Sequence, residues 1–107
     1  MTTPQEILRI EQDVVAVLKN IFDPEIPINI YDLGLIYAID AEPDGVVNIS
    51  MTLTAPTCPM ADFLIAEVNR EVGKVNGVKA VNVALTFDPP WDRNMMSEET
   101  LLELGLL

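Results

Sequence analysis

The sequence predicts an α+β domain in which helices cover one face of a small mixed three-stranded sheet, in the order α-β-β-α-β-α. Two patterns lead to this prediction. Apolar residues recur at helical spacing in some segments and alternate with polar residues in others. A helical segment also separates the second and third strand segments, so these strands should run parallel if they are neighbours. We expect the 107 residues to form one domain (1–107) that needs neither a metal nor a disulfide to fold.

The chain is strongly acidic, with seventeen acidic and six basic residues and a formal net charge of −11. Phosphate backbones and anionic lipids are bound through Lys and Arg, so this charge argues against nucleic-acid and membrane partners. No stretch approaches the ~20 apolar residues that span a bilayer, and the N-terminal segment lacks the apolar run of a signal peptide. A single cysteine cannot form an intrachain disulfide. We therefore expect a cytoplasmic protein.

The first helix has a clear predicted start. Thr3 suits the N-cap, Pro4 suits the first helical position, and Glu6 can complete a capping box. Apolar residues then follow at helical spacing and predict a buried face, which comprises Ile7, Ile10, Val14, Val15, Leu18 and Ile21. Pro24 disfavours helical geometry at Asp23, so the helix should end there.

The segment 23–27, Asp-Pro-Glu-Ile-Pro, is a stiff acidic corner. Its residue types allow two interpretations. The simpler one is a helix stop at which Asp23 and Glu25 are solvated; the other makes the two carboxylates part of a site.

Residues 33–41 and 46–54 have the apolar and alternating character of strands, and the turn sequence Glu-Pro-Asp-Gly at 42–45 should join them into an antiparallel hairpin. Gly34 suggests a bulge or a close backbone approach. In the second strand, one face is predicted to be apolar (Val47, Ile49, Met51 and Leu53) and the other polar (Asn48, Ser50, Thr52 and Thr54).

A second helix is predicted over 59–75, with an apolar stripe formed by Met60, Leu64, Val68 and Val72. A third strand should follow over 78–87 and end at the two prolines of Asp-Pro-Pro-Trp. Ser97 is the expected N-cap of a short last helix that packs back through Leu101, Leu102 and Leu104, and Gly105 can end it. Trp91 is either an apolar lid on the core or an exposed binding aromatic, and the lid is favoured because tryptophan is usually largely buried.

Cys58 is the strongest candidate for a chemical centre because, with Pro59 at the first helical position, it falls at a helix N-cap. Free amides and the positive helix end stabilise a thiolate, which is the form that attacks electrophiles and binds metals. The alternative is an unreactive, half-buried cysteine in a turn. The chain has no histidine to act as a base, which argues against a thiol hydrolase. A closed zinc site or a cluster needs about four ligands, so any metal at Cys58 would be held transiently or shared between chains.

Three blocks of the sequence occur together in a known family. They are Asp-Pro-Glu-Ile at 23–26 with Asn-Ile-Tyr-Asp-Leu-Gly-Leu-Ile-Tyr at 29–37, then Thr-Leu-Thr to Cys-Pro at 52–59, then Asp-Pro-Pro-Trp at 88–91 with Met-Ser-Glu and a terminal Leu-Gly. Over nearly its whole length the chain resembles the SufT-like and PaaD-like family of iron–sulfur cluster assembly proteins. The resemblance implies a fold similar to the C-terminal domain of the iron–sulfur assembly scaffold.

The resemblance also implies the residues of a site. The family's acidic motif corresponds to Asp23 and Glu25, its reactive cysteine to Cys58, its preceding threonine to Thr54, and its aromatic closure to Trp91. Thr57 stands where many members have glycine, a departure that bears on the conformation of the loop.

The resulting hypothesis is a non-enzymatic maturation factor for iron–sulfur proteins, whose partners are the assembly machinery and client apoproteins. No stably bound cofactor is expected; iron or an iron–sulfur cluster would be transient cargo. Two alternatives are an accessory subunit of a multicomponent oxygenase, as in the PaaD-like branch, and a cysteine-dependent enzyme. The exposed edges of a three-stranded sheet favour a homodimer.

Overall fold

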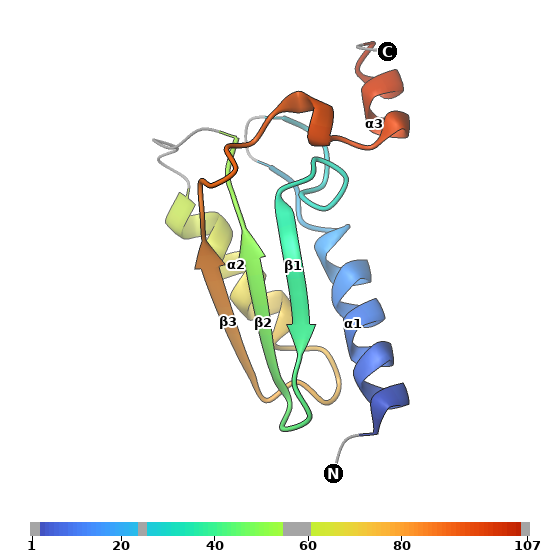
Figure 1. Ribbon diagram of the computed structural model, residues 1–107, viewed down its shortest axis with the longest axis vertical. Coiled ribbons are helices and arrows are strands. Elements are labelled where there is room, and N and C mark those ends of the chain that lie inside the picture. The colour runs from blue at the N-terminus through green and yellow to red at the C-terminus, as the bar shows by residue number, and fades with distance from the viewer. Residues whose placement is uncertain (1–2, 24–25, 55–60, 106–107) are drawn as a thin grey trace.

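The computed structural model describes residues 3–23, 26–54 and 61–105. Their elements follow the predicted order, with one addition: a short 3-10 helix before the last α-helix (Figure 1). In chain order they are α1 (Pro4–Leu18), β1 (Ile36–Ala41), β2 (Val46–Met51), α2 (Ala61–Val72), β3 (Ala80–Leu85), η1 (Arg93–Met95) and α3 (Glu98–Glu103). Within this part of the chain, no helix has the length and apolar character that crossing a membrane requires.

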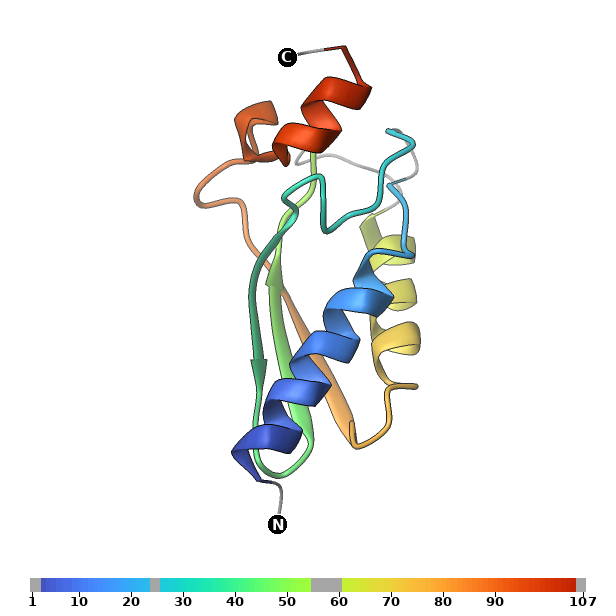
Figure 2. The same cartoon turned by 90° about the vertical axis from the view of Figure 1, so that its right-hand side faces the viewer.

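The sheet has the strand order β1-β2-β3, with β2 antiparallel to β1 and parallel to β3. The predicted mixed sheet is therefore confirmed. Helices α1 and α2 lie side by side on one face, where α1 contacts β1 and α2 contacts β3 (Figure 2). The other face carries small and polar side chains from all three strands, and Asn82 Nδ2 on β3 donates a 3.1 Å hydrogen bond to Asn48 Oδ1 on β2.

The core lies between the sheet and the two long helices. The predicted apolar face of the second strand is buried, and so are the α2 stripe from Leu64 onward and most of the predicted α1 stripe. The core residues of these three segments are Ile10, Val14, Leu18, Val47, Ile49, Met51, Leu53, Leu64, Val68 and Val72. Met60, the first residue of the predicted α2 stripe, lies outside the described residues.

The start of α1 is as predicted, but its end is not. The Thr3 side chain accepts a hydrogen bond from the Glu6 amide, whereas the helix stops at Leu18 instead of continuing to Asp23. The cause is tertiary: Ile30 N donates to the Ile21 carbonyl at 2.8 Å, which pulls the chain out of helical geometry while Ile21 stays buried. Helical spacing alone could not show this, because Ile21 is a core residue in either conformation.

The predicted first strand is shortened at its start, because residues 30–34 form a turn and β1 begins only at Ile36. Gly34 has a φ of +82°, and a Cβ atom there would overlap the backbone carbonyl of Met95. The predicted close backbone approach at Gly34 is thus confirmed, and the bulge lies further along, between Ile36 and Ala38. β2 and β3 are also shorter than the predicted 46–54 and 78–87.

The last helix, α3, has the predicted N-cap, since the Ser97 hydroxyl accepts a 3.2 Å hydrogen bond from Thr100 N. Leu101 and Leu104 pack against the core as expected. Leu102 does not, because its side chain is 64% exposed. A six-residue helix presents only one side to the protein, and Leu102 lies off that side.

Candidate functional site

Strands β2 and β3 both finish at one end of the molecule, at the top of Figure 1, which we call the site end. Strand-like pairing continues past β2: Thr52 N donates to Leu35 O at 2.8 Å, and Thr86 N donates to Met51 O at 2.9 Å. Leu53 is buried, and the predicted site residue Thr54 follows it in a half-buried position. The chain thus leaves the central strand at the middle of this end.

Asp23 lies in a tight loop at the site end. Its backbone amide donates to Ile28 O at 3.1 Å, its Oδ1 accepts a 3.0 Å hydrogen bond from Ile26 N, and the residue is only 7% exposed. The flanking residues Phe22 and Asn29 form an isolated antiparallel bridge. The interpretation of Asp23 as a solvated helix stop is therefore wrong, because its carboxylate is buried and orders the loop backbone.

The segment that follows β3 closes the site end. Trp91 packs against the core, and its Nε1 donates a 2.7 Å hydrogen bond to Leu33 O. Tyr37 Oη donates to Pro89 O at 2.7 Å, and Ser97 N donates to Asp32 O at 3.1 Å. These contacts bear out the lid interpretation of Trp91 and join the first and third sequence blocks.

A clamp within the first block was not predicted. Asn29 Nδ2 donates to Asp32 Oδ2 at 2.8 Å, while Asp32 N donates to Asn29 Oδ1 at the same distance. The clamp shapes the turn that presents Leu33 O to Trp91 and Gly34 to Met95. Asn and Asp at a spacing of three residues, just before an expected strand, are the signal that could have indicated it.

Three predicted site residues, Asp23, Thr54 and Trp91, belong to segments that meet at the site end (Figure 1). The other three, Glu25, Thr57 and Cys58, lie outside the described residues. The predicted N-cap role of Cys58 therefore stays a prediction. The helix that it would cap is described from Ala61, with Asp62 in the first turn.

A pocket of about 230 Å³ lies at the site end, between the loop after α1 and helix α3. Asp32, Glu99 and Glu103 make it acidic, and the exposed Phe22 forms part of its wall. The remaining lining residues are Pro27, Ile28, Asn29 and Thr100. Sequence reasoning missed this pocket because it exists only when α3 docks on a loop about seventy residues earlier in the chain. Among the described residues, no group of three or more acidic or cysteine side chains is arranged to hold a metal ion.

Thr52 is a further residue whose environment differs from the prediction. Its expected place is the polar face of the second strand, yet it is fully buried just beyond the last residue of β2. Its Oγ1 has no hydrogen-bond partner.

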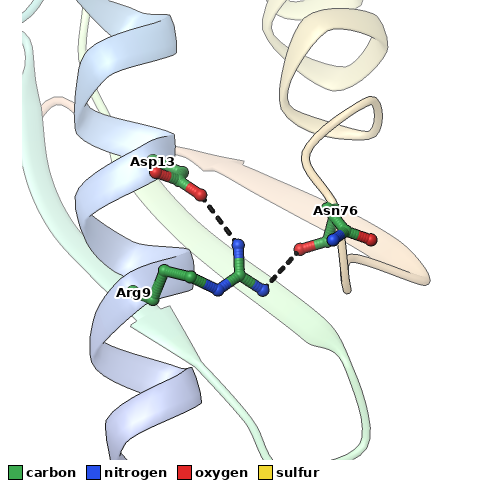
Figure 3. Close-up of polar contacts among 3 residues, drawn as sticks. All are labelled: Arg9, Asp13 and Asn76. Atoms are coloured by element: carbon green, nitrogen blue, oxygen red, sulfur yellow. Dashed lines mark hydrogen bonds and ion pairs between the residues drawn. The ribbon is translucent and has the colours of Figure 1, made fainter.

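The opposite end, which we call the hairpin end, contains the turn 42–45 and the start of α1. There Arg9 on α1 forms an ion pair with Asp13 at 2.8 Å and donates through Nη2 to Asn76 O at 3.0 Å (Figure 3). In the last turn of α2, a hydrogen bond from Lys74 lowers the pKa of the half-buried Glu71 carboxyl. Basic residues are thus used structurally at the hairpin end, whereas carboxylates dominate the pocket at the site end.

Comparisons with known proteins agree with this fold. A family described as iron–sulfur cluster assembly protein matches residues 11–85. The chain belongs to this family.

Individual relatives and solved structures align with most of the length of this chain. It is 56% identical over 102 residues to the Fe-S protein maturation auxiliary factor of Porphyromonas gingivalis, spanning 95% of this chain and 97% of that one. It is 34% identical to the maturation auxiliary factor SufT of Staphylococcus aureus, over 80% of this chain and 98% of that one. A crystal structure of a domain of unknown function from Bacillus anthracis superposes with a TM-score of 0.89 at 29% identity, over 98% of this chain and all of the other.

Proposed function

We propose that this protein is a non-enzymatic maturation factor for iron–sulfur proteins that works through protein contact and the thiol of Cys58. The observation that carries the proposal is the family membership together with near-complete coverage of a 56% identical relative named for this role. The convergence at the site end of segments from all three sequence blocks supports it, because residues 50 to 60 positions apart are tied together there.

The chemistry follows from what a single thiol can do. A thiolate binds iron well, but a cluster commonly takes four such ligands, so Cys58 needs ligands from a second molecule. Iron or a cluster is therefore cargo, held at Cys58 only while the assembly machinery or a client apoprotein supplies the other ligands. The Asp23 carboxylate holds the backbone amide of Ile26, and Thr54 and Trp91 belong to the segments that follow β2 and β3. We further propose that the protein acts in the cytoplasm and that it forms a homodimer.

The decisive experiment is complementation. Cells that lack this gene are supplied with the wild type, Cys58→Ser, or the control Lys74→Gln at the far end of the molecule, and the activities of cellular iron–sulfur enzymes are measured. We expect wild-type activity with Lys74→Gln and loss of activity with Cys58→Ser at equal protein levels. Full activity with Cys58→Ser would eliminate the thiol from the mechanism.

A second measurement separates a reactive thiol from a structural one. The rate of alkylation of Cys58 is followed against pH in the purified protein. A thiolate ligand should titrate below the ordinary cysteine pKa of about 8.5.

Anaerobic co-purification from the native host, with assays for iron and for partner proteins, identifies the clients. Recovery of oxygenase subunits alone would favour the accessory-subunit alternative.

A further inference from the structure

The outer edge of β3 is a bare strand edge. Thr86 N donates to Met51 O on β2, and in a parallel ladder alternate residues direct their amides and carbonyls to the same neighbour. The backbone groups of Val81, Val83 and Leu85 therefore point away from the sheet. Among the described elements, none lies beside this edge (Figure 1).

The outer edge of β1 is protected in three ways. A bulge interrupts it between Ile36 and Ala38, and Asp40 places a charge on it. At its end, Ala41 N donates a 3.2 Å hydrogen bond to Glu11 Oε2 on α1, which occupies an amide that would otherwise be available. These are the ways in which proteins prevent strand pairing at an edge.

β3 has none of these features. Its sequence Ala-Val-Asn-Val-Ala-Leu contains no charge and no proline, and its pairing with β2 is regular over all six residues. In a chain of net charge −11, an uncharged strand is where two copies can approach with the least repulsion. Lys79 precedes the strand and Asp88 follows it, so an antiparallel pair places charges of opposite sign near each other at both ends of the contact.

We infer that two copies of this chain pair their β3 strands antiparallel, so that the two sheets become one. The register follows from the outward groups: Val83 lies opposite Val83 of the second copy, and Val81 lies opposite its Leu85. By symmetry Leu85 lies opposite Val81 of the second copy, and these three residue pairs can form about six backbone hydrogen bonds. Leu85, which is 38% exposed in the single chain, gains an apolar neighbour.

This arrangement goes beyond the proposed function because it fixes how two sites are disposed. Antiparallel β3 strands direct the two site ends in opposite directions. One dimer therefore presents two separate sites to two clients, and the two copies do not share one cargo ion. A single pair of strands buries little surface, so association should be weak and dependent on concentration.

The test uses side chains on the exposed face of β3, where the register places Asn82 opposite Ala84 of the second copy. The double variant Asn82→Asp/Ala84→Asp puts carboxylates opposite each other, and Asn82→Lys/Ala84→Lys does the same with amines. Each alone should weaken self-association by about tenfold or more in sedimentation equilibrium, because directly opposed like charges destabilise a strand pair. A mixture of the two should associate again. The matched control is Ala38→Asp, an exposed alanine on the protected edge, and it should leave association unchanged.

Hydrogen exchange reads the register directly. In the wild type, the amides of Val81, Val83 and Leu85 should exchange more slowly as the protein concentration rises, and the inward amides of Asn82 and Ala84 should not respond. A chain that stays monomeric up to about 1 mM, or a dimer that ignores both double variants, would overturn the inference. Circular dichroism of each variant confirms that it is folded. Client maturation by the monomeric variants is measured separately, so failure of the dimer and failure of the maturation role give different results.

Discussion

The two ends of this molecule are held together by different means. At the hairpin end, the exposed side chain of Arg9 links α1 to the loop after α2, and water competes for both of its contacts. At the site end, the links involve backbone groups: Met95 O lies against Gly34, and Leu33 O accepts a hydrogen bond from the Trp91 indole. The first kind of link tolerates change, because solvent can replace it. The second leaves a clash or an unpaired carbonyl when one group changes.

The largest effect should come from Gly34→Ala at the site end. The added methyl group meets the Met95 carbonyl, and alanine disfavours a φ of +82°. We expect a loss of about 2–4 kcal/mol in the free energy of unfolding, measured by urea denaturation. Gly105→Ala is the matched control, since its φ is also positive but no atom lies within 4 Å of the new methyl group. Equal losses in both variants would mean that backbone strain, and not the contact with Met95, dominates.

A smaller effect should follow from Trp91→Phe, which keeps an aromatic ring but removes the donor to Leu33 O together with part of the indole that packs on the core. The carbonyl of a fully buried residue then lacks its partner, which costs about 1–2 kcal/mol. If closure of the site end is needed for function, the rate of client maturation should fall by more than the loss of folded protein alone would cause. An unfolding curve superimposable on that of the wild type would show that the indole hydrogen bond contributes nothing.

The hairpin end offers the contrasting case, Arg9→Met. Methionine keeps much of the aliphatic length and loses both the ion pair with Asp13 and the bond to Asn76 O. Because both partners are well exposed, we expect a loss of about 0.5 kcal/mol and unchanged client maturation. A loss above about 2 kcal/mol would place the Arg9 link in the same class as the site-end contacts.

The smallest effect should come from Glu71→Gln, and it should appear only in the pH dependence. The hydrogen bond from Lys74 lowers the pKa of Glu71 in the folded state, so its contribution is present above the unfolded value of 4.5. That contribution is lost as the pH falls through the lowered folded value. The variant should therefore match the wild type at acidic pH and be slightly less stable at neutral pH. Thermal unfolding from pH 3 to 7 measures the difference, and a larger deficit at acidic pH would contradict the assignment.

The sequence predicted the elements of this fold well because local signals and burial agree there. Thr3 and Ser97 cap helices where predicted, and Val47, Ile49 and Met51 face the core. The errors share one cause, which is contact with distant residues. Helix α1 ends earlier than predicted because Ile21 O accepts a hydrogen bond from Ile30 N. Leu102 is exposed because α3 packs on the protein through its other side.

For the candidate site, the sequence proposes a set of residues and says nothing of their geometry. Asp23 and Trp91 were selected through the family resemblance, but the buried carboxylate of one and the indole bond of the other depend on segments far along the chain. The pocket beside α3 and the buried hydroxyl of Thr52 had no local signal at all, because both depend on where an element ends or docks.

The contact between Trp91 and Leu33 has a consequence for the order of events during synthesis. It joins residues 58 positions apart, and Tyr37 joins Pro89 across 52. A nascent chain that has reached Leu85 already contains all three strands and both long helices, yet the groups that close the site end have not been made. The contacts that close the site end can therefore form only after Trp91 has been made, later in synthesis than the sheet and the two long helices.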